Sequence, residues 1–214
     1  GIKNILGAIR QPAGILVDID ALASLPSRDL CSGFAEIVKH GLIADRAYFD
    51  RVTSRLFSDW SADELVELVF RSCEIKRDVV EADESEQGLR KTLNFGHTLG
   101  HAIEALALRE RGSLTHGEAV SIGMRAPSYL SYRLGLISSE EYTEIVAGIS
   151  KVGLPTRLPT LMNEASLLEL MSLDKKNIGG KTRWTLLQRI GAAVIDQQVD
   201  GSLIKDAIAE IQAQ

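Results

Sequence analysis

The sequence lacks the features that mark several classes of protein. No apolar run approaches the roughly 18 residues of a membrane span, and no signal peptide is recognisable, so we expect no membrane partner. Basic residues are not in excess: 24 Lys and Arg stand against 29 Asp and Glu, and the net charge is −5. Because a nucleic-acid-binding face would be basic, we do not expect nucleic acid as a partner either.

Two further absences concern redox chemistry and cofactors. The two cysteines, Cys31 and Cys73, do not have the spacing of a metal site, and we interpret them as buried thiols of a protein in the reducing cytoplasm. The GxGxxG phosphate loop and a βαβ run of parallel strands are both missing. This chain by itself is therefore not expected to hold a nicotinamide cofactor firmly.

The sequence does have an ordinary globular composition with helical periodicity. Hydrophobic residues make up 45% and charged residues 25% of its 214 residues, enough for one substantial domain or two small ones. A short edge strand at 13–19 and a hairpin of 183–188 with 193–196 are expected within a mainly α fold. Apolar spacing and capping residues predict helices at 20–24, 28–44, 61–81 and 119–134. They also predict one helix that ends near residue 108 and three that begin at 138, at 163–166 and at 200.

The stretch of residues 90–104 carries the densest polar pattern. Asn94, His97, His101 and Glu104 follow one another at helical spacing and would share one stripe of a helix. A buried, unpaired stripe would cost stability, and a metal or an anionic ligand would offset that cost. Two glycines in the same stretch predict close approach of another backbone. The stretch alone leaves open that the histidines are hydrogen-bonded core residues.

Metal ligands are available on three short segments: Glu36, the pair His97 and His101, and His116. One carboxylate and two imidazoles would make an open catalytic zinc site that leaves a position for water or substrate. Spacing alone also allows His97 and His101 to share one metal, because histidines at i, i+4 can do so. The residues therefore predict a metal site without choosing its ligands.

Positive charge falls on the same segments. Lys39, Lys76, Arg90 and the pair Lys175 and Lys176 could converge on one pocket, where they would suit phosphate and carboxylate groups. For any one of them taken alone, a solvated side chain on a helix surface is the favoured interpretation. The prediction of an anion-binding pocket depends on their joint placement, which spacing does not establish.

Four stretches of the chain carry a family resemblance. They are residues 33–41 (GFAEIVKHG), 76–80 with 86–90 (KRDVV and EQGLR), 93–101 (LNFGHTLGH) and 116–118 (HGE), with support from 174–177 and 3–8. With these motifs the chain resembles the C-terminal part of the 3-dehydroquinate synthase family of sugar-phosphate cyclases. The resemblance covers essentially the whole chain, and the segment 94–101 is highly specific for this family.

The resemblance implies a role for each matching residue. Zn²⁺ (or Co²⁺) would be held by Glu36, His97 and His116, while His101 and Glu86 would transfer protons and Arg90 would act with them. The substrate would be bound by Asn4, Lys39, Lys76, Arg90, Asn94 and one of Lys175 and Lys176, and NAD⁺ would touch Lys3 and Ser24. His40 stands where the family often has Tyr, and Ser24 where it often has Thr.

The resemblance also implies a reaction and an organisation. The substrate would be the phosphorylated sugar acid 3-deoxy-D-arabino-heptulosonate 7-phosphate. Transient oxidation by NAD⁺ would be followed by elimination of phosphate, return of the hydride, ring opening and an aldol closure. In the family an N-terminal α/β domain carries the cofactor fold. We therefore expect residues 1–214 to be the helical metal- and substrate-binding domain, with 1–25 leading in from a missing cofactor domain. The chain alone should be nearly inactive, and the family is expected to form a homodimer.

Other functions fit the same residues. A different sugar-phosphate cyclase would use the same machinery on another sugar, although Arg90, Asn94 and His101 suit a carboxylated substrate. A metal-dependent alcohol or glycerol dehydrogenase would share the two-domain plan and would produce NADH. A helical interaction module without enzymatic activity would bind no zinc.

Overall fold

The computed structural model describes residues 10–109, 114–159, 162–172 and 183–212. The polypeptide is mainly helical and carries one antiparallel hairpin, as the sequence predicts. Within the described part, every helix is too short or too polar to cross a membrane. The elements are η1 (Ile19–Ser24), α1 (Ser27–Ala44), α2 (Arg46–Val52), η2 (Phe57–Asp59), α3 (Ala62–Ala82), η3 (Leu89–Asn94), α4 (His97–Arg109), α5 (His116–Arg133), α6 (Ser139–Lys151), α7 (Glu164–Ser172), β1 (Arg183–Arg189), β2 (Ala192–Gln198) and α8 (Gly201–Gln212).

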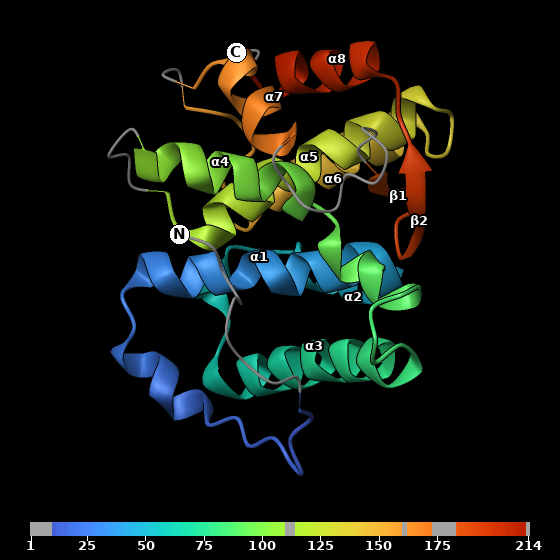
Figure 1. The fold of residues 1–214 in the computed structure, drawn as a ribbon. Coiled ribbons are helices and arrows are strands. Elements are labelled where there is room, and N and C mark those ends of the chain that lie inside the picture. The colour runs from blue at the N-terminus through green and yellow to red at the C-terminus, as the bar shows by residue number, and fades with distance from the viewer. Residues whose placement is uncertain (1–9, 110–113, 160–161, 173–182, 213–214) are drawn as a thin grey trace.

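Helix α1 occupies the middle of the molecule. Figure 1 shows α3 on one side of it and α4 and α5 on the other. Phe34, Ala35, Val38 and Leu42 are fully or almost fully buried, because an apolar stripe with helical spacing faces these neighbours. The central position of α1 explains why polar side chains on the same helix can lie beside groups from several other elements.

Helix α5 is buried on nearly every side and joins two hydrophobic clusters. Val120 and Met124 pack into the cluster around α1, whereas Ile122 and Leu130 pack into the cluster formed with α4, α7, α8 and β1. The buried polar side chains of α5 are each hydrogen-bonded, as burial requires: Ser121, Arg125, Ser128 and Ser131. The first residue of α5, His116, is thereby held by the core of the whole fold.

Local sequence signals account for most element boundaries. The capping box predicted at Ser61 is formed, since the Ser61 and Glu64 side chains each bond the other's backbone amide. Ser138 caps α6 in the same way, and Asn163 accepts a bond from the Ser166 amide at the start of α7. The turn of the hairpin falls at Gly191, whose φ of 89° favours glycine.

Two predictions about elements were wrong. Within the described residues, 13–18 have no regular structure and pair with no strand, and Leu16 is 96% exposed. The helix expected through 90–104 is broken at Gly96, whose φ is 79°, so that Asn94 ends η3 and His97 begins α4. Helix α2 was not foreseen. Cys73 is exposed, although Cys31 is buried as expected.

Candidate functional site

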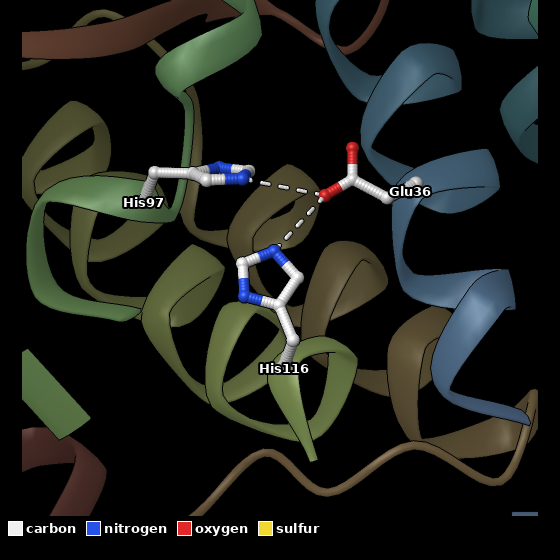
Figure 2. A group of neighbouring side chains, drawn as sticks. All are labelled: Glu36, His97 and His116. Atoms are coloured by element: carbon white, nitrogen blue, oxygen red, sulfur yellow. Dashed lines mark ion pairs between the residues drawn. The ribbon is translucent and has the colours of Figure 1, made fainter. Parts of the chain in front are cut away.

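Three side chains from three helices converge on one point. Figure 2 shows Glu36 on α1, His97 at the start of α4 and His116 at the start of α5, with both imidazoles directed at the carboxylate. Oε1 of Glu36 lies 3.3 Å from Nε2 of His97 and 3.8 Å from Nε2 of His116. Among the residues that the structure describes, these three form the group whose possible ligand atoms all lie within 4.8 Å of one another.

The donor set fits a divalent metal. A carboxylate oxygen and two imidazole nitrogens are the ligands of open zinc sites, which keep a coordination position for water or substrate. His101 is not part of this group, although its ring centroid lies 5.3 Å from that of His97, about as near as that of His116 at 5.5 Å. Of the two ligand sets that spacing allows, the geometry favours Glu36, His97 and His116.

A glycine brings the start of α5 against α1. A Cβ placed on Gly117 would lie 1.9 Å from the carbonyl oxygen of Ser32, so no side chain fits there. The Gly117 amide also donates a 3.0 Å hydrogen bond to the Ser32 hydroxyl. Ser32 lies about one helical turn before Glu36, and this contact therefore sets His116 next to the carboxylate.

A second contact fixes the same helix end. Glu118 completes a capping box with Thr115, which satisfies free amides in the first turn of α5. The Glu118 carboxylate also accepts two hydrogen bonds from Arg28 on α1, at 2.8 and 2.6 Å. Although burial alone would raise the pKa of Glu118, the bond from Arg28 keeps it below its usual range. The pair thus clamps α5 to α1 beside His116.

The position of His97 depends on close packing of α4 against α5. A Cβ on Gly96 would lie 2.5 Å from Cγ of Met124, and one on Gly123 would lie 2.2 Å from the Gly96 carbonyl oxygen. The two helix backbones can approach only because both positions lack a side chain. The predicted close approach is therefore present. The two glycines allow α4 to begin directly against the middle of α5.

Glu36 is held as a carboxylate. Burial alone would raise its pKa, but the hydrogen bond with His97 and the positive charge of Lys39 outweigh burial and place the pKa well below its usual range. The Lys39 ammonium is almost fully buried and lies 2.5 Å from Oε2 of Glu36 and 2.7 Å from the Leu93 carbonyl oxygen. Burial lowers the pKa of Lys39, and the Glu36 charge opposes that shift. One oxygen of Glu36 thus faces the lysine and the other faces the imidazoles.

His40 is the buried histidine next to this pair. Burial and the positive charge of Lys39 lower the pKa of His40 to about 4, so its ring is neutral near pH 7. Nδ1 of the ring lies 2.7 Å from the Ser72 hydroxyl on α3. The bond ties α1 to α3 beneath the site.

A cavity of about 680 Å³ opens beside the three converging side chains. It is bounded by α1, α3, η3 and the starts of α4 and α5. Its walls are apolar over large parts, and they carry both signs of charge where the site lies. The residues predicted for the site that line it are Glu36, Lys39, Lys76, Glu86, Arg90, Asn94, His97 and His116.

The loop that carries Glu86 and Arg90 is organised by Asp83. The Asp83 carboxylate accepts hydrogen bonds from the amides of Gln87, Gly88 and Arg90, at 3.0, 2.7 and 3.0 Å. These bonds lower the pKa of Asp83. Glu86 has a φ of 57°, a conformation that is uncommon for a residue with a side chain.

Other predicted residues lie away from the cavity or outside the described residues. Ser24 is exposed at the end of η1, and its hydroxyl donates to the Ala21 carbonyl oxygen. Leu22 and Leu25 of the same segment do line the cavity. Lys3, Asn4, Lys175 and Lys176 lie outside the residues that the structure describes.

Sequence reasoning missed the residues that support the site. Arg28 and Ser32 act through the start of α5, and no spacing signal marks them. Glu104 was placed on the polar stripe without a role, yet its Oε2 lies 3.1 Å from Nδ1 of His116. A signal was available, because Glu104 follows His97 by seven residues and so projects from the same side of α4.

Comparison with known proteins agrees with the fold and the motifs. The family model for the 3-dehydroquinate synthase C-terminal region matches residues 33–177. A 3-dehydroquinate synthase of Thermodesulfovibrio yellowstonii is 40% identical over 210 residues, and one of Synechococcus is 41% identical over 213. These matches cover 97% and 98% of this chain. The chain spans only 58% and 57% of the length of these two curated relatives.

Solved structures show the same architecture. A 2-deoxy-scyllo-inosose synthase complexed with carbaglucose-6-phosphate, NAD⁺ and Co²⁺ superposes with a TM-score of 0.83 at 25% identity. A 2-epi-5-epi-valiolone synthase of Streptomyces hygroscopicus with NAD⁺ and Zn²⁺ bound also gives 0.83, at 27% identity. The matches cover 97% and 98% of this chain and 58% of each structure. Its motifs, its fold and its identity to these relatives together show that the chain belongs to the 3-dehydroquinate synthase C-terminal family.

Proposed function

We propose that this chain is the metal- and substrate-binding part of a 3-dehydroquinate synthase. The reaction would convert 3-deoxy-D-arabino-heptulosonate 7-phosphate to 3-dehydroquinate and phosphate, with Zn²⁺ or Co²⁺ and NAD⁺ as cofactors. The observation that carries the proposal is the convergence of Glu36, His97 and His116 beside a cavity that also exposes Lys76 and Arg90. A metal site and anion-binding side chains are what a phosphorylated, hydroxylated sugar acid requires.

The three ligands would hold the metal at the edge of the cavity. A divalent cation bound there polarises a substrate oxygen and lowers its proton affinity. Glu36 would bind through Oε1, because Oε2 already faces Lys39. The two Nε2 atoms of His97 and His116 would complete the protein's share of the coordination.

The cationic side chains would orient the substrate. Lys76, Arg90 and Asn94 line the cavity from α3 and η3, at positions from which they can bind carboxylate and phosphate oxygens. Such fixed contacts keep a flexible sugar acid in one orientation, which is itself a large contribution to rate. Lys39 and one of Lys175 and Lys176 would add to this set, as would Asn4.

Proton transfer would fall to Glu86 and His101. The Asn94 amide donates a 3.1 Å hydrogen bond to Oε1 of Glu86, which directs the carboxylate toward the substrate-binding side chains. His101 lies one helical turn after His97, next to the proposed metal. An imidazole there could take a proton from a substrate hydroxyl or return one.

The complete reaction is proposed for a protein that combines this chain with the rest of the length of its relatives. Lys3 and Ser24 would contact NAD⁺ from this side. We expect the 214 residues alone to show little or no turnover, because the cofactor-binding motif is not among them. A cytoplasmic location and a homodimer also belong to the proposal, and size-exclusion chromatography tests the second.

Metal analysis of single variants tests the site directly. Purified chain loaded with zinc and dialysed should retain about one metal per chain. Glu36→Ala, His97→Ala and His116→Ala should each lose it, because each removes one of three protein ligands. His101→Ala is the matched control and should keep its zinc. Loss of zinc in His101→Ala together with retention in His116→Ala would overturn the ligand assignment.

A different sugar-phosphate cyclase is the second candidate. The two cyclase structures described above favour it, because one of them holds a sugar-phosphate analogue and both hold NAD⁺ and a metal. The protein that contains this chain should release phosphate from 3-deoxy-D-arabino-heptulosonate 7-phosphate and not from glucose 6-phosphate. The reverse preference would favour this candidate, and net NADH production would instead indicate a dehydrogenase.

A further inference from the structure

The two imidazoles of the site use their ring nitrogens in the same way. In both His97 and His116 the Nε2 atom faces Oε1 of Glu36. The Nδ1 atom of His97 lies 3.2 Å from the Phe95 carbonyl oxygen, and that of His116 lies 3.1 Å from Oε2 of Glu104. Figure 2 shows that the second nitrogen of His116 points away from Glu36.

These partners determine which nitrogen carries the proton. A carbonyl oxygen and a carboxylate oxygen only accept hydrogen bonds, so Nδ1 must donate in both rings. A neutral imidazole protonated at Nδ1 has its lone pair on Nε2, which is the atom that faces the proposed metal position. A metal bound beside Glu36 would replace the proton on the Nε2 side, and the Nδ1 contacts would then hold both rings in the tautomer that binds a metal through Nε2.

The two rings differ in what holds them. The side chain of His97 is only 14% exposed, and its acceptor is a backbone oxygen two residues earlier in the chain. The side chain of His116 is 42% exposed at the end of a helix, and its acceptor is a side chain on a different helix. The orientation of His116 thus depends more on its partner than that of His97 does.

Glu104 is well placed for this task. It lies seven residues after His97 on α4, so the same helix supplies one ligand and the acceptor for the other. Its side chain is 21% exposed, and its Oε2 lies within hydrogen-bonding distance of Nδ1 of His116. A carboxylate bonded to an imidazole also makes the other nitrogen a stronger donor to a metal.

We propose that Glu104 is a positioning residue of the metal site, which fixes the tautomer and orientation of His116 without touching the metal. The inference rests on the proposed metal-dependent function. It predicts that removal of the Glu104 carboxylate weakens metal binding about 10- to 100-fold while the ligands remain in place.

Two variants at this position separate its charge from its hydrogen bond. Glu104→Gln keeps an oxygen that can accept from Nδ1 but removes the charge, and we expect an intermediate loss of affinity. Glu104→Leu removes both and should show the full loss. Glu67→Gln is the control, because Glu67 is an exposed carboxylate paired with Arg51 on another face.

The experiment measures Co²⁺ and Zn²⁺ affinity by competition with a chromophoric chelator, and the visible absorption of the Co²⁺-loaded chain. A merely structural role for Glu104 would lower the melting temperature of the metal-free chain and leave the Co²⁺ bands unchanged. The proposal predicts altered Co²⁺ bands and a metal-free melting temperature close to that of the wild type. Should Glu104→Leu not fold, the isosteric Glu104→Gln carries the same test.

The outcomes distinguish this inference from the proposed function. The positioning role would be overturned if both Glu104 variants bound metal with wild-type affinity and an unchanged Co²⁺ spectrum. If His116→Ala lost metal in the same experiment, the proposed metal site would still hold. If the wild-type chain takes up neither Zn²⁺ nor Co²⁺, the proposed function fails and the inference fails with it.

Discussion

Replacement of Gly123 by alanine tests how closely α4 and α5 must pack to form the site. The added Cβ would lie 2.2 Å from the Gly96 carbonyl oxygen and 2.8 Å from the Gly100 amide nitrogen. Real Cβ atoms are essentially never closer than 3.0 Å to such neighbours. Both obstacles are backbone atoms, so no side-chain rotation can relieve the clash. The two helices must therefore separate by about 1 Å.

The cost of that separation can be worked from the packing. Overpacked cores lose about 1–3 kcal/mol, and a gap of about 1 Å removes up to roughly half of the dispersion energy of the contacts that face it. Leu99, Ile103 and Ile122 are fully buried in this interface. We therefore expect the free energy of unfolding to fall by about 3–4 kcal/mol. For a chain of this size the melting temperature should drop by roughly 10 °C.

The same variant should also weaken the metal site. His97 directly follows Gly96, so a shift of α4 moves this ligand away from His116 on α5. A displacement of about 1 Å is large for a coordinating group, and we expect metal affinity to fall by about tenfold or more. Thermal unfolding of the metal-free chain reports the packing, and chelator competition reports the site. Gly201→Ala is the matched control, because no atom lies within 4 Å of its Cβ position. A melting temperature for Gly123→Ala within about 2 °C of the wild type would refute the reasoning.

Three other predictions each concern one residue. Asp83→Ala should accelerate hydrogen exchange of the three loop amides that Asp83 binds, with little change elsewhere. Unchanged exchange would mean that the loop keeps its conformation without the Asp83 carboxylate. Arg28→Met should weaken zinc binding several-fold, because the clamp on Glu118 is lost. Equal affinity would show that the clamp is dispensable. Burial raises the pKa of Tyr142 to about 12, whereas the unfolded side chain ionises near 10, so its contribution is intact below about pH 10 and lost as pH rises toward 12. The free energy of unfolding should therefore fall over this interval, and Tyr142→Phe should remove part of the decline in denaturant titrations; an equal decline in Tyr142→Phe would contradict the assignment.

Much of the helical framework could be predicted because its signals are local. The apolar stripe of α1, the capping box at Ser61 and the turn at Gly191 each depend on residues within a few positions of one another. Such features need no knowledge of what packs against them. The mainly α fold with one hairpin followed from the same kind of pattern.

The predictions that failed depended on distant neighbours. Residues 13–18 have the composition of a strand, but no strand in the described part of the chain lies beside them. The helix through 94–104 looked continuous, because a glycine in a helix and a glycine that ends one look alike in sequence. The structure shows the difference: Gly96 has a φ of 79°, and its Cβ position lies 2.5 Å from Cγ of Met124, so only glycine fits there.

For the site, chemistry was more predictable than geometry. Carboxylates, imidazoles and cations in short motifs indicated a metal and an anionic ligand, and the family resemblance assigned their roles. The convergence of the three ligands depends on tertiary contacts that the sequence does not show, such as that of Gly117 with Ser32, which sets His116 against α1. Spacing placed Glu104 on the same side of α4 as His97, but its partner His116 lies on another helix and is identified only by the structure.

The structure specifies the role of Lys39, which the sequence analysis named only as a substrate-binding residue. A buried ammonium is costly unless it is paired, and among the described residues Glu36 and the Leu93 carbonyl oxygen pair with that of Lys39. An ammonium has three N–H groups, so these two contacts leave a single donor for a ligand. Lys39 would then bind substrate through one hydrogen bond at most, while it holds Oε2 of Glu36 and leaves Oε1 for the metal. Lys39→Met should therefore impair metal affinity as well as substrate binding, in contrast to Lys76→Met, which should impair substrate binding alone. Equal metal affinity in the two variants would return Lys39 to a role in substrate binding only.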